Sequence, residues 1–510
     1  MDFVTETWRH AAASAAGAAL VLAIATAGAA RRPRLERGLC LALAATALAS
    51  FANFGDLRLQ TDRGFVHRWE HFHYHLGSKY FPELGYDGLY VASLAAQHAS
   101  HPGLAMGRRL RDLRTNRSTR AGDASAHRRE VRARFTPERW QSFVADHAAF
   151  AESGGERFLG GVRSDHGYNP TPAFTFVARL ATAHAPVGPR ASLALALVDP
   201  LLLGLAFVFV FRSFGLRVGC LALAVVGLGF GWRYNYLGAL LRLDWLAAVL
   251  VGVSLLARGR AGAAGALVGY AAAVRLFPLL FALGPALLAV RAWRRGERPA
   301  WARRFFTGLA LALGLALVAG SLAGRGPGAW LEFAERIALH QATWASTRVG
   351  LETAVRHGPA ALAAGFAGAL PERPGQAEAA RVNGERWPIR ALLAAAMLAL
   401  FALGVRRATP AQASALGVAA IWALTPAGAY YWILLAVAPL AGDCLLACGV
   451  LLLAAALYAH QALHSAVEWN AFRYALLSWG IGLVLVAWLA RWVWRGAAPP
   501  AGGAQPIRDA

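Results

Sequence analysis

Long apolar runs dominate the pattern of hydrophobic and polar positions along this chain. Most of these runs are long enough to cross the ~30 Å hydrocarbon core of a bilayer as helices, and short arginine-rich loops separate them. The pattern therefore predicts an all-α polytopic membrane protein with about thirteen transmembrane helices. The predicted crossings are residues 11–30, 38–55, 191–212, 217–231, 235–257, 261–274, 276–293, 305–324, 389–405, 411–428, 430–448, 449–466 and 473–494.

Short basic loops orient the predicted crossings. Alternation of the crossings places all of these loops on one side of the membrane, and the positive-inside rule identifies that side as the cytoplasm. The loops are RRPRLERG (31–38), RSFGLR (212–217), RGR (258–260), RRGERPAWARR (294–304), RR (406–407) and RWVWRG (491–496). Arginine is used almost to the exclusion of lysine, with abundant Ala and Gly, which is typical of a GC-rich bacterium. We therefore expect a multi-pass protein of the bacterial cytoplasmic (inner) membrane.

Two long polar segments, residues 56–190 and 325–388, fall on the opposite, outer side. In the first segment, GYDGLYVASLAAQHA and FTPERWQSFVADHAAFAESG have the pattern of amphipathic helices. Thr136 is the expected N-cap of the second helix, because Pro137 follows it at the first helical position. We expect both helices to lie along the membrane surface.

The second outer segment predicts a helix lying over the site. Between residues 330 and 355 apolar side chains recur at near-helical spacing, at Trp330, Phe333, Ile337 and Trp344. His340 and Arg348 would then face an acceptor, although a plain amphipathic surface helix explains the same pattern. Residues 1–510 are expected to form a single membrane domain, with a disordered tail at 496–510.

The composition fits this picture and excludes some functions. The chain is 57% hydrophobic, 15% charged and carries a net charge of +23. Most arginines lie in short loops beside apolar runs, where topology and anionic lipid headgroups explain them, so a nucleic-acid partner is not expected. The cysteines Cys40, Cys220, Cys444 and Cys448 lie in or beside apolar runs without metal-ligand spacing, which is typical of small core residues.

Charged residues inside apolar runs are costly, so each is a candidate for function. Asp199 precedes a proline, Arg242 and Asp244 interrupt one run, and Arg275 divides another into two short halves. Arg275 should lie near the outer end of a helical hairpin, where it can bind an anionic group. The structural alternatives are a kink at Asp199, a buried ion pair for Asp244, and an Arg275 side chain that reaches the lipid headgroups.

The stretch HRWEHFHYHLGSKYFPELGYDGLY (67–90) concentrates polar and aromatic side chains at the membrane edge. The histidines at 71, 73 and 75 alternate, so they share a face only on a strand and would need carboxylates from elsewhere to hold a metal ion. The aromatic residues suit a membrane-interface belt. His73 and Tyr74 are also candidates for binding a substrate.

The carboxylates of the first outer segment are candidates for general base catalysis. Glu70 precedes a run compatible with a helix and could deprotonate a sugar hydroxyl, although a solvated surface acid is the alternative. Asp62 lies eight residues earlier and is the second candidate base. Lys79, the only lysine of the chain, joins Arg275 as a candidate for binding a phosphate.

The order of these features resembles that of the integral-membrane GT-C glycosyltransferases. It is most similar to the bacterial polyprenol-phosphate-mannose-dependent mannosyltransferases of the DUF2029 type. The stretches that carry the resemblance are WEHFHYHLGSKYFPELGYDGLY (69–90), YNPTPAFTFVARL (168–180), GALVGYAAAVRLFP (265–278) and LTPAGAYYWILLAVAPLAG (424–442). Glu70 stands where the family usually has Asp, Arg275 replaces its lysine, and tyrosines replace its late histidine.

The resemblance implies transfer of a sugar, with inversion, from a polyprenyl-phosphate donor to a lipid or glycan acceptor at the outer membrane face. Glu70 would be the base, and Arg275 would hold the leaving phosphate. No metal or other cofactor is implied. The residues expected to contact substrate are His73, Tyr74, Tyr168, Asp244, His340, Arg348, Tyr430 and Tyr431.

Other functions remain open at this point. A transporter or flippase of lipid-linked sugars would also use intramembrane charges and helices broken by Pro and Gly. A lipid–carbohydrate ligase and a non-enzymatic membrane scaffold are further alternatives. The position of the site distinguishes them, because a GT-C enzyme should gather its acids at the outer surface, whereas a transporter should line the midplane.

Overall fold

Eight helices in the described part of the chain are long and apolar enough to cross a membrane. The computed structural model describes residues 3–54, 65–100, 109–230, 238–343, 345, 347–357, 363, 376–464 and 470–495. The eight candidate spans are Val4–Ala29, Pro33–Ala52, Pro189–Leu228, Phe277–Arg294, Ala300–Ser321, Trp387–Val405, Leu445–Leu463 and Phe472–Trp494. The protein is therefore a multi-pass helical membrane protein.

The remaining predicted crossings fall on shorter or bent helices. Segments 191–212 and 217–231 largely lie in one helical stretch, which bends at Gly215, where φ is +80°. The others correspond to helices of 13 to 15 residues. These helices are Asp244–Ala257, Ala261–Arg275, Pro410–Leu424 and Ala429–Ala441. The count of thirteen crossings therefore stays a prediction.

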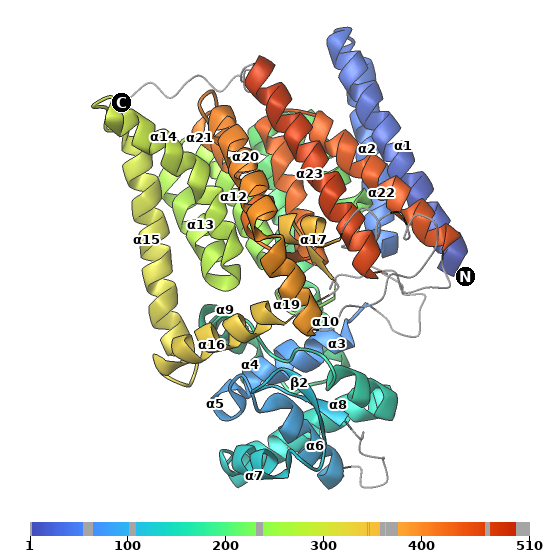
Figure 1. The fold of residues 1–510 in the computed structure, drawn as a ribbon, viewed down its shortest axis with the longest axis vertical. Helices are drawn as coiled ribbons and strands as arrows, with labels where there is room; N and C mark the ends of the chain where they lie inside the picture. Colours follow the sequence, from blue (N-terminus) through green and yellow to red (C-terminus); the bar gives the residue numbers. More distant parts are fainter. Residues whose placement is uncertain are drawn as a thin grey trace.

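The apolar helices form one bundle (Figure 1). They are α1 (Phe3–Ala29), α2 (Pro33–Phe54), α10 (Pro189–Ala196), α11 (Val198–Leu228), α12 (Asp244–Ala257), α13 (Ala261–Arg275), η2 (Phe277–Ala282), α14 (Leu283–Arg294), α15 (Ala300–Ser321), α20 (Trp387–Val405), α21 (Pro410–Leu424), η3 (Ala429–Ala441), α22 (Leu445–Leu463) and α23 (Asn470–Arg495). Glycines bring some of them close together. A Cβ at Gly265 of α13 would lie 1.9 Å from the Phe305 carbonyl oxygen of α15, so only a small residue permits this packing.

The basic loops contact one another in pairs at one end of the bundle, uppermost in Figure 1. The contacts are the ion pairs Arg217–Glu36 (3.2 Å) and Arg491–Asp443 (2.9 Å), and the hydrogen bonds from Arg291 to the Arg406 carbonyl (3.1 Å) and from Arg407 to the Val493 carbonyl (2.8 Å). This arrangement agrees with the grouping that the positive-inside rule requires.

A second unit, which we call the cap, covers the opposite end of the bundle (Figure 1). It comprises the described residues between 65 and 188. Its elements are α3 (Arg68–His71), the π-helix η1 (Phe72–Leu76), α4 (Gly77–Lys79), α5 (Phe81–Leu84), α6 (Leu89–Ser100), β1 (Arg109–Asp112), β2 (Arg117–Arg120), α7 (Ser125–Ala133), α8 (Pro137–Val162) and α9 (Pro172–Thr182). The Thr136 side chain accepts the Arg139 N–H and caps α8, as predicted.

The apolar faces of α6 and α8 pack within the cap, and the position of these helices along the membrane surface stays a prediction. The two helices pack against each other, and α6 is buried along most of its length. Aromatic residues of the 67–90 stretch belong to the core of the cap, since the ring centroids of Tyr80 and Phe143 lie 5.0 Å apart. Among the described residues of 65–179, no large hydrophobic side chain is exposed. The protein itself covers the apolar faces that the sequence pattern assigned to lipid.

The second outer segment is less helical than predicted. Helix α16 (Gly328–Ala342) ends well before residue 355 and is followed by β3 (Arg348–Val349), α17 (Leu351–Arg356) and α19 (Gln376–Glu385). Strand β3 pairs with β4 (Ala427–Gly428), and β1 pairs with β2. These short ladders are exceptions to an otherwise all-helical architecture. Trp344, one of the apolar residues that predicted this helix, and the predicted tail, 496–510, lie outside the described residues.

Candidate functional site

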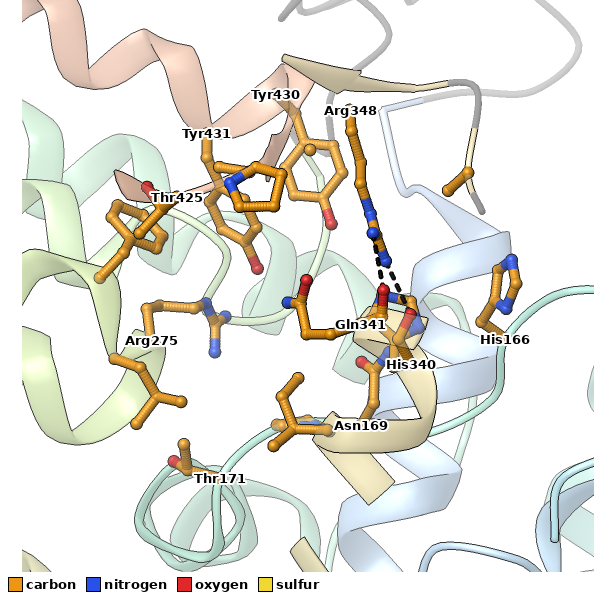
Figure 2. Close-up of a pocket in the computed structure, with 18 of the residues that line it drawn as sticks. His166, Asn169, Thr171, Arg275, His340, Gln341, Arg348, Thr425, Tyr430 and Tyr431 are labelled. Carbon is orange, nitrogen blue, oxygen red and sulfur yellow. Dashed lines mark hydrogen bonds between the residues drawn. The ribbon is translucent and has the colours of Figure 1, made fainter. Parts of the chain in front are cut away.

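A cavity of about 720 Å³ lies where the cap meets the bundle (Figure 2). Its walls come from distant parts of the sequence: α3 and η1, the loop 165–171, the turn before α12, the junction of α13 and η2, α16, β3 and the segment 424–431. Among the predicted site residues, those lining the cavity are Glu70, His73, Tyr74, Arg275, His340, Arg348, Tyr430 and Tyr431. The structure therefore brings together most of the residues selected from the sequence.

A buried ion pair forms one wall of the cavity. The Glu70 carboxylate lies 3.1 Å from Nε of Arg242, and their side chains are 7% and 3% exposed. The Arg242 guanidinium donates a hydrogen bond to the Tyr74 hydroxyl. It also stacks over the rings of Tyr74 (4.6 Å) and Tyr430 (4.8 Å). Such pairing offsets the desolvation of both charges and holds Glu70 in one orientation.

The turn 238–243 connects the cap to three helices of the bundle. The Gly238 carbonyl accepts the His67 N–H (2.9 Å) just before Glu70. The Arg242 N–H donates to Asp199 of α11 (2.7 Å). The Leu241 carbonyl accepts the Arg275 guanidinium of α13 (2.8 Å). This turn therefore positions Glu70, Arg242 and Arg275 relative to one another. The kink alternative for Asp199 is replaced by a specific backbone contact.

We expect Gly238→Ala to lower the thermal stability of the purified protein by several degrees. Gly238 has φ = +81°, and a Cβ there would lie 1.8 Å from the Phe65 carbonyl oxygen. A non-glycine residue in such a conformation costs about 1–3 kcal/mol before the clash is counted. Gly160→Ala on α8 is the control, because a Cβ at Gly160 would have no atom within 4 Å. An equal melting temperature for Gly238→Ala and wild type would contradict the role of this turn.

Arg275 ends α13 and points into the cavity (Figure 2). Its guanidinium lies 4.5 Å from the Phe174 ring centroid and donates to the carbonyls of Val274 (3.0 Å) and Leu241 (2.8 Å). The side chain is buried, so the alternative in which it reaches lipid headgroups is wrong. Among the described residues no carboxylate pairs with it, and its Nε has no hydrogen-bond partner. The cavity therefore contains a guanidinium that can bind an anion.

A second carboxylate, Asp165, lines the cavity and was not selected from the sequence. It accepts the indole N–H of Trp69 (2.8 Å) and the backbone N–H of His166 (2.8 Å). Burial opposes its ionisation, but His73 and these hydrogen bonds leave its pKa below the usual range. It lies in an irregular loop without periodicity. The only signal in the sequence is its place just before the YNPTP segment.

Two histidines and an arginine form the polar rim of the cavity (Figure 2). The rings of His166 and His340 meet edge to face with centroids 5.2 Å apart. Burial, together with the nearby charge of Arg111, lowers the pKa of His166 to about 4. Burial, together with the neighbouring His166 ring, lowers the pKa of His340 to about 3. Both rings are therefore neutral at pH 7. Arg348 donates to the carbonyls of His340 (2.7 Å) and Gln341 (3.1 Å), which caps the end of α16.

Three predicted site residues within the described part of the chain, Lys79, Tyr168 and Asp244, do not line the cavity. Lys79 pairs with Asp146 (2.8 Å) inside the cap, so it is held away from the site expected to bind phosphate. The Tyr168 hydroxyl bonds Ser78 and Thr175, and Asp244 accepts the Tyr270 hydroxyl (2.7 Å). Arg242, two residues before Asp244, lines the cavity in place of that aspartate. Asp62 lies outside the described residues.

The alternating histidines are engaged in the packing of the cap. The His73 ring bonds the Trp69 carbonyl (2.8 Å) and the Tyr90 hydroxyl (2.8 Å), and His71 contacts the Gly238 carbonyl (3.0 Å). Across the described part of the chain, no group of three His, Cys, Asp or Glu side chains is placed to hold a metal ion.

Comparisons of the chain with protein-family models, with curated proteins and with solved structures give no match. The chemistry of the cavity must therefore be argued from its own residues. It combines an oriented carboxylate that can accept a proton, a guanidinium without a carboxylate partner among the described residues that can bind an anion, and tyrosine hydroxyls that can donate hydrogen bonds. These are the groups that transfer of an activated sugar or phosphate ester requires.

Proposed function

We propose that the protein is a membrane glycosyltransferase of the GT-C kind. It would move a sugar from a polyprenyl-phosphate donor to a hydroxyl of a lipid or glycan acceptor, at the outer face of a bacterial cytoplasmic membrane. One observation carries the proposal: a single cavity combines Glu70, Arg242 and Arg275 with an apolar wall that reaches the lipid-facing surface of the bundle. That combination suits a substrate with a charged head and a hydrocarbon tail.

The apolar wall supports a lipid substrate. Leu276, Leu279 and Leu424 line the cavity, yet they are 48%, 45% and 47% exposed. They lie on or beside η2 and at the end of α21, where the neighbouring surface of the bundle is apolar. A prenyl tail can leave the cavity over these side chains and remain in hydrocarbon, while its phosphate stays at the adjacent Arg275.

The proposed reaction is a single in-line displacement. Glu70 takes the proton of the acceptor hydroxyl, and the acceptor oxygen bonds the anomeric carbon as the bond to the phosphate oxygen breaks. The polyprenyl phosphate leaves with both electrons of that bond, and Arg275 stabilises its charge. Attack opposite the leaving group inverts the anomeric configuration. No second acid is needed, because the phosphate is already a good leaving group.

The other predicted contacts are assigned to the sugar and the acceptor. The hydroxyls of Tyr430 and Tyr431 point into the cavity, and that of Tyr431 lies on the side of Arg275 (Figure 2). Tyr74 holds the Arg242 guanidinium. His340 and Arg348 stand at the rim, where an acceptor would enter.

The location of the cavity favours an enzyme over a transporter. It lies at the end of the bundle beside the cap, away from the basic loops, rather than midway along the helices (Figure 1). If those loops are in the cytoplasm, as the positive-inside rule favours, the cavity faces the periplasm in this proposal. A transporter or flippase of lipid-linked sugars would need a path through the middle of the bundle.

Purified protein in liposomes with radiolabelled polyprenyl-phosphate sugars tests the proposal. We expect release of polyprenyl phosphate and transfer of label to a membrane or glycan extract, because the donor bond is broken. Protein inactivated by heat is the control. Movement of intact donor between leaflets would instead identify a flippase. No release with any polyprenyl-phosphate sugar would contradict the enzyme.

A further inference from the structure

A strongly basic surface runs from the rim of the cavity toward the part of the cap farthest from the bundle. It is built from the β1–β2 hairpin and α7, whose exposed and half-buried arginines we call the basic face. Between residues 109 and 134 the chain has nine arginines and three acidic residues, a net charge of +6. These arginines cannot be explained as cytoplasmic topology signals, because they lie on the cap and not on the end that carries the basic loops (Figure 1).

The hairpin places like charges opposite each other. Arg109 is the ladder partner of Arg120, and both are exposed. Like charges at directly opposed positions destabilise a strand pair. Within the described part of the chain, the side chain of Arg109 donates to the hydroxyl and the carbonyl of Ser118. No carboxylate among the described residues pairs with Arg117, Arg120 or Arg129. The fold thus retains a repulsive arrangement that a bound polyanion would relieve.

The basic face is joined directly to the rim of the cavity. Arg111 of β1 donates to the Ser164 carbonyl (3.0 Å), just before Asp165. At the tip of the hairpin, Asn116 bonds the His166 ring (3.1 Å) and the Thr343 hydroxyl at the end of α16 (2.7 Å). A chain lying along the hairpin would therefore reach the rim formed by His166 and His340.

We propose that the basic face binds an anionic polymer in the aqueous phase, a glycan carrying carboxylate or phosphate groups, and holds it at the rim of the cavity. The role of this polymer as the acceptor rests on the proposed glycosyltransferase function. Its binding to the basic face does not depend on that function. Membrane headgroups fit less well, because α7 lies at the end of the molecule farthest from the bundle (Figure 1). A membrane surrounding the bundle would not reach Arg128 and Arg129.

Binding of fluorescent polygalacturonate to the full-length protein in neutral detergent tests this inference. The variant replaces four arginines of the basic face by glutamine: Arg117, Arg120, Arg128 and Arg129. The control replaces four exposed arginines of the loop at the other end of the bundle: Arg294, Arg298, Arg303 and Arg304. We expect the first variant to weaken binding about tenfold or more at low salt and the control to change it less than about twofold, because exposed charges act over roughly 10 Å.

Equal losses in both variants, or no binding of polygalacturonate by wild type, would overturn the inference. Binding of the basic face to anionic vesicles but not to the polymer would also overturn it, in favour of lipid. Neutral dextran should not bind.

The position of the polymer is tested with a fluorophore. A label at Ser164→Cys, beside the rim, should respond to polygalacturonate, and a label at Glu297→Cys should not; the opposite result would place the polymer elsewhere. If the protein binds the polymer but transfers no sugar, the proposed glycosyltransferase function is wrong and the polymer-binding site is still supported. If the rate of sugar transfer is equal in wild type and in the variant of the basic face, the polymer is not the acceptor, but its binding to the basic face is still supported.

Discussion

We expect Glu70→Gln to lower the rate of the proposed sugar transfer by about two to four orders of magnitude and to leave donor binding nearly unchanged. Glutamine keeps the size of the side chain and one carbonyl oxygen, but it cannot take a proton from the acceptor. The Arg242 guanidinium keeps its contacts with Tyr74 and Tyr430, so the wall of the cavity should keep its shape. The measurements are single-turnover release of polyprenyl phosphate and, separately, donor affinity.

Glu83→Gln is the matched control for this change. Glu83 comes from the same stretch and pairs with Arg139 (2.6 Å), but it does not line the cavity. Its replacement tests whether loss of any buried ion-paired carboxylate reduces transfer through stability alone. If Glu70→Gln transfers sugar at the wild-type rate while Asp62→Asn or Asp165→Asn does not, the base is that aspartate. If none of the three changes matters, the displacement mechanism proposed above is wrong.

Arg275→Ala should weaken donor affinity by about tenfold to a hundredfold, because a charge-assisted hydrogen bond to phosphate contributes about 1.5–3 kcal/mol. Arg275→Lys keeps the charge but loses the bidentate geometry, so we expect an intermediate affinity. Equilibrium binding of a labelled polyprenyl-phosphate sugar measures both. Arg291→Ala is the control, since Arg291 is exposed at the opposite end of the bundle. Equal affinity in wild type and Arg275→Ala would refute the phosphate role.

Local signals in the sequence predicted the helices well. Apolar runs located the main helices of the bundle, and the break at 212–217 coincides with the bend at Gly215. Thr136 and Pro137 marked the start of α8 because capping depends on neighbouring residues only. The same reasoning did not predict that α6 and α8 pack against each other, because an apolar face shows that a helix is covered without showing whether lipid or protein covers it.

The sequence predicted many of the residues that line the cavity, but it did not predict which residues contact one another there. Arg275 was selected because a charge inside an apolar run is costly, and Glu70 because it precedes a run compatible with a helix and matches the acid of the resembling family; both line the cavity. Lys79 was selected as the only lysine of the chain, but a distant residue, Asp146, holds it inside the cap. The structure turns Arg242, and not Asp244, toward the cavity. The backbone just before Arg242 has a positive φ of +48° at Leu241, and the sequence could not predict this conformation because leucine rarely adopts it.

The turn 238–243 also determines when the cavity can form during synthesis of the chain. Tyr74 and Arg242 are 168 residues apart, and Glu70 lies earlier still. At a synthesis rate of roughly 5–20 residues per second, the first cap helix waits on the order of ten seconds or more for its partner on the bundle. During that interval Glu70 stands without Arg242 and can remain hydrated. The ion pair is buried only when α11, α12 and α13 have been inserted, and the walls from residues 333–348 and 424–431 follow later still, so closure of the cavity is a late event in assembly of the bundle.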